Sequence, residues 1–443
     1  MSSKRGWDLR MNRVRGCLSL FGGILLGFLF FPSILITSET LTLEQALNEA
    51  RSKSLLLRQA EEQIKAAEFG AAEQRTYFYP SFALSGSYSY QDGETLSGPG
   101  TSVEVNDWDY NTVSFGITQP LYTGGQLKGQ YESAKISVDL ARSFYDLEVL
   151  DLGFEVKEAY FAALRLEKAV AVTKELVNNR QRHLIEVEKR VKVGVLPKVE
   201  QLKAEVELAH SQDNLVSAEN SLKVSFSGLN RLLERPLDME WTLSDVAPLM
   251  PPVLPDIDSC YRQALQDRPD RKSAHLNVMQ MEKEVKVARS GYYPRVDLLL
   301  VHEEFQDDAF SSGWNYDDQA LVTVSYDLWN WGRVKDSVNA SQSQKKQAET
   351  ELDSLERSIR LEVKNAYLSV LSAQVRIGTA EKAVDQAKEV LRMQTIRFQE
   401  GMATNTDVLD ADFALAQVQT DYYNARYDYL TAEATLTRSL GAE

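Results

Sequence analysis

The chain carries one long sequence pattern twice, and this duplication constrains its fold more than any other feature. At an offset of 207 residues the second copy follows the first without a gap from the Gly125/Gly332 pair to the C-terminus. Upstream, around Pro80 and Pro294, the offset is 214. The two offsets differ by 7 residues, so the first copy must contain an insertion between the two matched segments. A repeated pattern of this length predicts two similar structural halves within one chain.

We place the first half at residues 39–234 and the second at 257–443. Residues 235–256 between them are rich in proline, which predicts an extended linker. Residues 1–38 begin with five basic residues and continue into an apolar run from Cys17 to Ile36, as in a secretory signal peptide. The alternative is a transmembrane anchor, but the run is barely long enough to cross a bilayer and Pro32 interrupts it.

Loss of residues 1–38 would make the mature chain more acidic. The segment carries five basic residues and one acid, so its removal takes the formal net charge from −15 to about −19. A strongly acidic chain is a poor match for nucleic acid. Cys17 would be lost with the segment, which leaves Cys260 without an intramolecular disulfide partner.

Each half is expected to begin with a helix and a β-hairpin. In the first half, Leu41 to Gln74 has apolar residues every three to four positions, which predicts one helix. From Ser81 to Tyr90 the period changes to two, with one apolar or aromatic face and one face of small, polar residues. The polar stretch QDGETLSGPGTSVEVND predicts a loop, and a second alternating run through Val113, Phe115 and Ile117 completes the hairpin.

The second half repeats the hairpin, with runs around residues 296–301 and 321–327. Each run can supply the ~9–11 residues that a tilted strand needs to cross a bilayer. Aromatic residues, which favour the water–lipid interface, cluster at the ends of these runs. The aromatic residues that we assign to this role are Tyr79, Trp108, Trp314, Trp329 and Trp331.

A proline-free helical pattern of roughly 67 residues follows each hairpin, on the order of 100 Å at 1.5 Å per residue. Helices of this length favour coiled-coil packing. Each pattern stops at a glycine, Gly194 or Gly401, and a shorter helix of ~35 residues returns. At the second of these tips we expect Asn405 or Thr406 to cap the returning helix, with Asp407 in its first turn.

Four strands cannot form a membrane barrel on their own. Unpaired backbone groups at sheet edges cost several kcal/mol each in lipid, so only closed barrels are tolerated there. Two copies would supply eight strands and three copies twelve, with room for a lumen lined by the Ser/Thr/Gly face. The alternative is a soluble periplasmic coiled-coil scaffold whose short strands pair without a membrane.

The order of these elements resembles that of the TolC-like outer membrane efflux protein family. The motifs that carry the resemblance are the joint LYTGGQL (Leu121–Leu127), its degenerate copy LWNWGRV (Leu328–Val334) and the tip GMATNTDVLDA (Gly401–Ala411). The resemblance covers essentially the whole mature chain. It implies a homotrimer with a twelve-stranded barrel in the outer membrane of a Gram-negative-type cell and a twelve-helix tunnel through the periplasm. It also implies docking onto a periplasmic adaptor (membrane fusion) protein and an inner-membrane transporter, in a tripartite efflux or type I secretion system.

The resemblance further assigns a periplasmic aperture to Asp407 and Asp410. These aspartates lie three residues apart on one helix face, so several copies would form rings of negative charge around an axis. The alternative is that Asp407 only stabilises a helix N-terminus and that Asp410 is simply solvated. Glu200 falls where the first tip is expected to carry an acid, and Phe398 occupies the place of a latch tyrosine without its hydroxyl.

By the same resemblance, both tips would contact the adaptor; the alternative is that they are plain hairpin turns. The first tip departs from the family pattern, since Val195-Leu196-Pro197 replaces a more polar turn, and the second has Ala403 where a basic residue is common. These departures put aperture latches that depend on the basic residue in doubt. The residues assigned to adaptor docking are Arg190, Gly194, Leu196, Arg397, Gly401 and Ala403.

An enzyme is the least supported alternative. The sequence contains no nucleophile–histidine pair, phosphate-binding loop or metal-spaced cluster, and its four histidines are scattered. We therefore expect no catalytic residues, no cofactor and no metal site. The sequence does not indicate whether the cargo would be a drug, a metal or a protein.

Overall fold

The computed structural model describes residues 40–92, 95–99, 101–104, 108–246, 254–307 and 313–442. The expected signal peptide, 1–38, and part of the expected linker lie outside these ranges. The helices are α1 (Leu43–Lys53), α2 (Leu55–Thr76), α3 (Gln126–Lys192), α4 (Lys198–Leu232), α5 (Ile257–Asp267), α6 (Pro269–Arg289), the 3-10 turn η1 (Ser290–Tyr292), α7 (Arg333–Gln399) and α8 (Asn405–Ser439). The strands are β1 (Thr40–Leu41), β2 (Ser81–Gln91), β3 (Thr95–Gly98), β4 (Thr101–Glu104), β5 (Trp108–Tyr122), β6 (Thr242–Leu243), β7 (Arg295–Asp307) and β8 (Trp314–Ser325).

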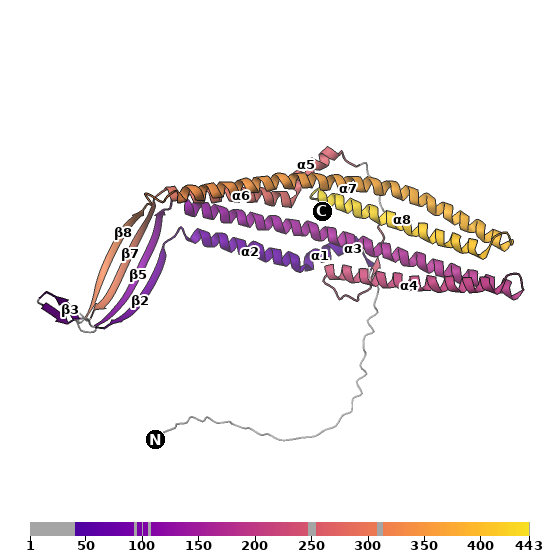
Figure 1. Ribbon diagram of the computed structural model, residues 1–443, viewed down its shortest axis with the longest axis horizontal. Helices are drawn as coiled ribbons and strands as arrows, with labels where there is room; N and C mark the ends of the chain where they lie inside the picture. Colours follow the sequence, from indigo (N-terminus) through magenta and orange to yellow (C-terminus); the bar gives the residue numbers. More distant parts are fainter. Residues whose placement is uncertain are drawn as a thin grey trace, which may run out of the picture. The chain divides into compact units, whose positions relative to one another are not determined.

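The two expected hairpins are confirmed, and they join into one antiparallel sheet. Its strand order is β2-β5-β7-β8, so the second strand of the first half pairs with the first strand of the second half (Figure 1). The outer edges of β2 and β8 pair with no other strand among the described residues. Peptide groups along both edges are therefore left without sheet partners.

The register places the two kinds of side chain on opposite faces of the sheet, as the alternation predicts. On the apolar face, Leu84 is 77% exposed and lies opposite Phe115. On the polar face, the hydroxyls of Ser85 and Ser114 lie 2.7 Å apart. One face of the sheet thus exposes large apolar side chains, while the other is polar along β2 and β5.

Two details of the first half differ from the expectation. The helix expected from Leu41 to Gln74 is broken at Ser54, which adopts a non-helical conformation (φ −51°, ψ 125°) between α1 and α2. The Ser54 hydroxyl accepts a hydrogen bond from the Leu57 N–H at 3.3 Å, so it caps α2. The expected loop between β2 and β5 contains a short antiparallel hairpin, β3–β4, in which four residue pairs form a separate two-stranded sheet.

The lengths of the long helices are confirmed. The two long helices, α3 and α7, have 67 residues each, and α4 and α8, which return from the tips, have 35 each. Near the sheet, α2, α3, α6 and α7 pack side by side in that order; near the tips the order is α4, α3, α8, α7 (Figure 1). The long helices therefore run through both sets, while shorter helices replace one another alongside them. Among the described residues, no helix is long and apolar enough to cross a bilayer.

The main core lies at the level where the shorter helices meet. Val156, Tyr160 and Leu229 are fully or almost fully buried there. The Tyr160 hydroxyl lies 2.8 Å from the carbonyl oxygens of Leu41, the last residue of β1, and Ser244, which follows β6 in the parallel β1–β6 pair. The expected linker, 235–256, thus contributes β6 and anchors the N-terminal strand.

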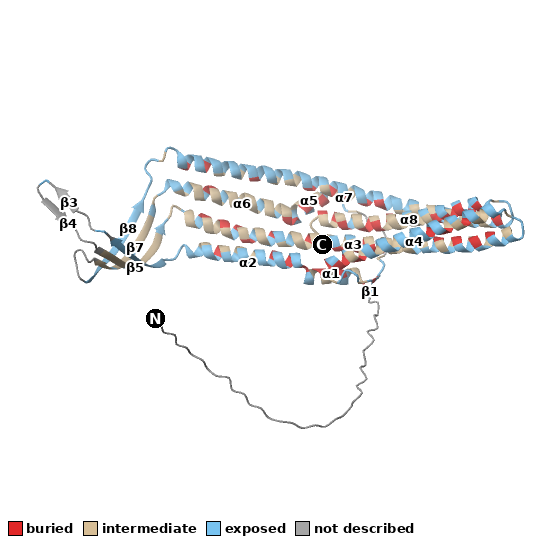
Figure 2. Ribbon diagram, turned by 60° about the horizontal axis from the view of Figure 1, so that its bottom comes forward, coloured by how far each residue is buried: buried red, intermediate tan, exposed pale blue. Residues whose placement is uncertain are grey.

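Large parts of α2 and α7, the outer helices of the set near the sheet, are exposed (Figure 2). Apolar side chains occur on these outer helices, including Phe69 on α2, which is 74% exposed, and Val375 on α7, which is 70% exposed. Exposed apolar side chains on both lateral edges of a helical layer indicate an interaction surface.

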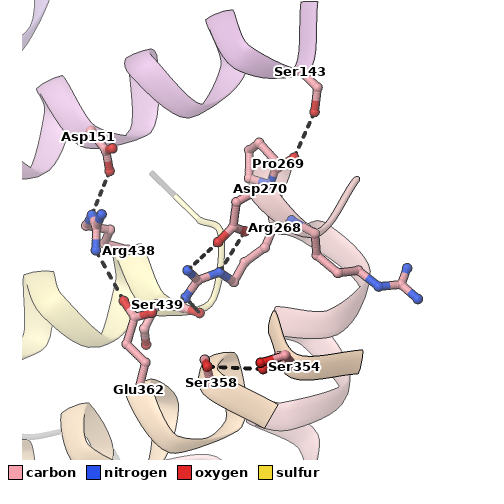
Figure 3. Close-up of polar contacts among 11 residues, drawn as sticks. Ser143, Asp151, Arg268, Pro269, Asp270, Ser354, Ser358, Glu362, Arg438 and Ser439 are labelled. Carbon is pink, nitrogen blue, oxygen red and sulfur yellow. Dashed lines mark hydrogen bonds and ion pairs between the residues drawn. The ribbon is translucent and has the colours of Figure 1, made fainter. Parts of the chain in front are cut away.

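A charged network joins α3, α6, α7 and α8 where the shorter helices meet (Figure 3). Arg268, only 8% exposed, donates to Asp270 at 2.7 Å and to Glu362 at 2.8 Å. Arg438 bridges Glu362 on α7 and Asp151 on α3, at 3.2 and 2.7 Å. The network therefore ties together both long helices through the start of α6 and the end of α8.

Candidate functional site

The two tips share one backbone design. In each, a glycine with positive φ (79° at Gly194, 77° at Gly401) ends the long helix. The following N–H, from Val195 or Met402, donates to the carbonyl five residues earlier, at 2.9 and 2.7 Å respectively. This is the Schellman arrangement, in which a left-handed glycine satisfies the last helical carbonyls. The expected glycine caps are confirmed.

The start of the returning helix differs between the tips. At the second tip the N-cap is Thr404, not Asn405 or Thr406, and it forms a capping box with Asp407. The Asp407 carboxylate accepts from the Thr404 N–H at 2.7 Å and from its hydroxyl at 2.8 Å. These hydrogen bonds, first that from the backbone, lower the pKa of Asp407. At the first tip the N-cap is Pro197, which makes no side-chain cap.

The two aspartates assigned to the aperture are both exposed, and Asp407 is held in place by its hydrogen bonds with Thr404. Asp410 lies beside Phe413, which is 55% exposed, in a groove of about 680 Å³ between α3–α4 and α8. Glu200 accepts from Lys203 at 3.0 Å, and this contact lowers its pKa. Asp407 thus stabilises the N-terminus of α8, as the alternative interpretation expected, and this does not exclude a role at an aperture.

Phe398 is buried at the seam between the two hairpins. It is 3% exposed and forms a cluster with Val187 and Val408. The Arg190 guanidinium stacks over its ring at 4.6 Å and donates to the carbonyl oxygens of Phe398 and Gln399, at 2.9 and 3.1 Å. A cation from the first half thus caps the C-terminus of α7 in the second.

His183 and Asn405 form a second contact across this seam. His183 Nε2 lies 2.6 Å from Asn405 Oδ1, and the Asn405 amide donates to the carbonyl and carboxylate of Glu200, both at 3.2 Å. Burial lowers the pKa of His183. His183 also lines a cavity of about 400 Å³, together with Phe398 and Asp412. Burial raises the pKa of Asp412, whose carboxylate accepts from Asn179 at 2.9 Å.

The residues assigned to adaptor docking divide into two groups. Gly194, Gly401 and Arg397 are exposed at the tips. Leu196 and Ala403 are half-buried and pack against the Phe398 cluster, and Arg190 is engaged with α7 as described. The most exposed apolar side chains at the tips are Val193, Val195 and Met402, at 73, 66 and 63%.

The aromatic residues assigned to a membrane interface lie at both ends of the sheet. Tyr79 precedes β2, and Trp329 and Trp331 follow β8 and are 74 and 88% exposed. Trp108 and Trp314 are the first residues of β5 and β8 at the opposite end. Trp331 has a φ of 55°, a left-handed conformation that is uncommon for a bulky residue.

Sequence reasoning missed His183, Asn179, Asp412 and Arg268. Each acts through a partner far away in the chain, such as the 222 residues between His183 and Asn405. The offset between the halves could have singled out some of them, because the position equivalent to His183 is Val390 and that equivalent to Arg268 is Ser54. An ionisable side chain that is present in only one half of a duplication is a signal of a contact specific to that half.

These features define a class: a duplicated chain of paired helical hairpins that share one open β-sheet. The sequence profile described as "Outer membrane efflux protein" matches residues 46–234 and 260–442. The chain belongs to this family. No group of three or more His, Cys, Asp or Glu residues suited to a metal ion occurs in the part of the chain that the structure describes.

Individual relatives agree with this assignment. The alkaline protease secretion protein AprF of Pseudomonas aeruginosa is 22% identical over 363 residues, which cover 79% of this chain and 74% of that protein. The outer membrane protein TolC of Escherichia coli K12 is 21% identical over 419 residues, covering 91% of this chain and 83% of TolC. The crystal structure of the outer membrane protein VceC from Vibrio cholerae has a TM-score of 0.77 at 20% identity, covering 90% of this chain and 96% of VceC. The likeness to VceC extends the TolC-like fold to this chain.

Proposed function

We propose that this chain forms an outer-membrane exit duct, a passive conduit built from three copies, for an efflux or secretion system. The observation that carries the proposal is the open four-stranded sheet. It has an exposed apolar face, a polar face along β2 and β5, and two edges that pair with no further strand in the described part of the chain. Such a sheet suits lipid only when neighbouring copies close it. Three copies would supply twelve strands, and the polar face would line the lumen.

The helical part of the proposal is a periplasmic tunnel that narrows at the tips. Rings of Asp407 and Asp410 would attract cations and repel one another, which favours opening when a partner compensates the charge. Because Asp407 also caps α8, its charge is fixed in position by Thr404 rather than free to swing away. Two kinds of transport are supported by the names of the relatives. AprF is named a secretion protein, and the family is described as outer membrane efflux proteins.

The membrane part of the proposal can be tested with two adjacent substitutions. Leu84→Arg places a charge on the apolar face, at a cost of about 2–4 kcal/mol if the site lies near the bilayer midplane. Ser85→Arg places the same charge on the opposite face. In planar bilayers, we expect Leu84→Arg to lose insertion, and Ser85→Arg to insert with reduced cation selectivity.

If both variants insert and conduct equally, the assignment of the two faces is wrong. A wild-type protein that stays soluble without detergent and never conducts would instead support the periplasmic scaffold. In the same bilayers, Asp407→Asn combined with Asp410→Asn should lower cation selectivity. An unchanged selectivity would remove both residues from the aperture.

We also propose that the tips bind a periplasmic adaptor that connects the duct to an inner-membrane transporter. The exposed apolar side chains Val195 and Met402 support this, since such side chains at a solvent-facing turn favour a protein partner. Replacing both by Asp leaves Leu196 and Ala403 packed in place. The double variant should lose co-purification with the adaptor and keep its conductance; retained co-purification would exclude the tips as the contact.

A further inference from the structure

The cavity at the seam between the two hairpins has the size and the lining of a small-molecule site. Its volume of about 400 Å³ falls within the range of about 300–1,000 Å³ that such sites occupy in proteins. Its walls come from α3, α7 and α8, and α8 packs against both of the other helices (Figure 1). Neither Asp407 nor Asp410 lines it. A molecule bound in this cavity would therefore touch both halves of the chain without occupying the proposed aperture.

Most of the wall that α7 and α8 contribute is apolar. Phe398, Val408 and Leu409 are 3, 5 and 8% exposed, and Leu391 is half-buried. Such a wall favours the apolar body of a ligand over water. It does not select a class of ligand, because any apolar group gains free energy from this burial.

Asp412 supplies the selective group. It lines the cavity and is only 5% exposed. In the described part of the chain, its one hydrogen-bond donor is the Asn179 amide, at 2.9 Å, and it forms no ion pair there. Burial raises the pKa of Asp412, as expected for a carboxylate whose negative charge is incompletely compensated. A positively charged ligand would supply the missing compensation.

The other ionisable groups of the lining leave this charge in place. Arg182 donates to the Asn179 carbonyl oxygen at 2.7 Å, while the nitrogen of the same amide donates to Asp412. Glu186 is a second acid, and His183 favours the neutral ring because burial lowers its pKa. With Asp412 ionised, the lining therefore holds two acids against one cation.

We infer that this cavity binds a small organic ammonium ion, with its positive group at Asp412 and its apolar body against Leu391 and Val408. A primary ammonium group donates charge-assisted hydrogen bonds to a carboxylate, whereas a neutral molecule of the same shape gains mainly the apolar contact. Because the bound ion would touch α3, α7 and α8, it stabilises the packed seam by mass action. The inference goes beyond the proposed duct and does not require it, since the whole site lies within one copy of the chain.

Binding of 4-fluorobenzylamine to the detergent-extracted protein tests the site, with 4-fluorobenzyl alcohol as the neutral counterpart. Fluorine NMR of each probe, corrected for micelles without protein, measures its dissociation constant. We expect Asp412→Asn to weaken binding of the amine by about tenfold or more, as expected for the loss of hydrogen bonds to a charged group. Asp421→Asn, which removes an exposed carboxylate from the same helix, should leave the dissociation constant unchanged.

A second variant separates the space from the charge. Thr395 lines the cavity, so Thr395→Phe fills part of the volume while keeping the Asp412 carboxylate. This variant should also weaken binding of the amine, by about tenfold, because the close-packed lining has no other room for the ring. Thermal unfolding without ligand shows whether each variant is folded. In the wild type, the amine should raise the melting temperature more than the alcohol does.

Equal affinities for the amine and the alcohol, or unchanged binding of the amine in Asp412→Asn, would overturn the inference. Binding that is lost in Asp410→Asn and retained in Asp412→Asn would place the cation at the exposed aspartates of the tip instead. A protein that conducts but does not bind the amine would overturn this site alone. A protein that binds the amine but never conducts would overturn the duct and leave the site.

Discussion

The two halves of the chain keep the same backbone while their side chains diverge. Every residue with positive φ in the described part of the chain has a counterpart 207 residues away that also has positive φ. The four pairs are Gly124/Trp331, Gly125/Gly332, Gly194/Gly401 and Glu234/Gly441. In two of these pairs, one half has a glycine and the other accepts a left-handed conformation at a larger residue. The backbone conformation of these turns is thus the same in both halves, even where one half lacks the glycine that adopts this conformation most easily.

The largest difference between the halves should appear at Arg268 and its counterpart, Ser54. Removing the Arg268 side chain leaves Asp270 and Glu362 without their shared cation in a poorly solvated site. We expect Arg268→Ala to destabilise the fold by about 3 kcal/mol. Breaking a buried ion pair costs about 3–5 kcal/mol, and the lower value applies here because Glu362 is partly exposed. Ser54→Ala loses only a helix cap, about 1 kcal/mol.

Thermal unfolding of the detergent-extracted protein measures both changes. Equal losses of stability in the two variants would mean that the charged network contributes no more than the cap. Ser358→Ala serves as a neighbouring control, because its hydroxyl donates only to the Ser354 carbonyl within α7 (Figure 3).

A smaller, reciprocal effect is expected at the joint between sheet and helix. Trp331→Gly should stabilise the detergent-extracted protein, because it removes about 1–2 kcal/mol of strain from the left-handed backbone at this position. Loss of the Trp329–Trp331 ring contact offsets part of this gain. Gly124→Ala should destabilise it, because the added Cβ would lie 2.7 Å from the Ser290 carbonyl oxygen in addition to the strain.

Melting temperatures of the two variants should therefore move in opposite directions. If Trp331→Gly lowers the melting temperature, the indole contributes more to the fold than its 88% exposure indicates. If it raises the melting temperature but weakens retention in lipid vesicles, Trp331 is kept for the membrane interface.

The smallest effect concerns pH at the tips. Burial lowers the pKa of His183, so the folded tip favours the neutral ring. The His183 contribution to stability is therefore lost as the pH falls from the ordinary histidine range, about 6.5, towards the lowered value. Glu186 opposes this shift and Arg190 adds to it, while Glu200 and Asp412 are the acids on α4 and α8 nearest the contact.

Hydrogen exchange of residues 397–409 measures this loss after correction for the intrinsic effect of pH. Between about pH 7.5 and about pH 5.5, protection should fall in the wild type and change little in His183→Gln, which retains a donor for Asn405. His210→Gln is the control, because His210 is exposed. A wild type and a His183→Gln variant with the same pH dependence would exclude His183 as the titrating group.

Much of the fold could be predicted from the sequence because its signals are local. The 67-residue helices follow from an unbroken apolar period that ends at glycines, and the first hairpin follows from strict alternation. The second hairpin was less clear, because Leu299 and Val301 interrupt the alternation. The break at Ser54 was missed because a serine with suitable flanking residues is compatible with both a helix interior and a cap. The β3–β4 hairpin was missed because its four-residue strands carry too little pattern.

The candidate site was less predictable than the fold. The exposed glycines and aspartates of the tips were found from motifs, but the contacts that hold the tips together join residues about 200 positions apart, as between Arg190 and Phe398. No local pattern encodes such a pair. The expected signal peptide, domain boundaries and aperture roles stay predictions.

The continuous helices have a mechanical consequence. Between Glu362, in the charged network, and its last residue, Gln399, α7 runs for about 55 Å without a proline, at 1.5 Å per residue. If α7 stays straight over this span, a change of its angle at the network becomes a displacement of the tip. A tilt of about 5° at the network would displace the tip by about 5 Å, roughly one helical turn. A small rearrangement around Arg268 and Arg438 would therefore move the far end of a straight helix by the size of a side chain.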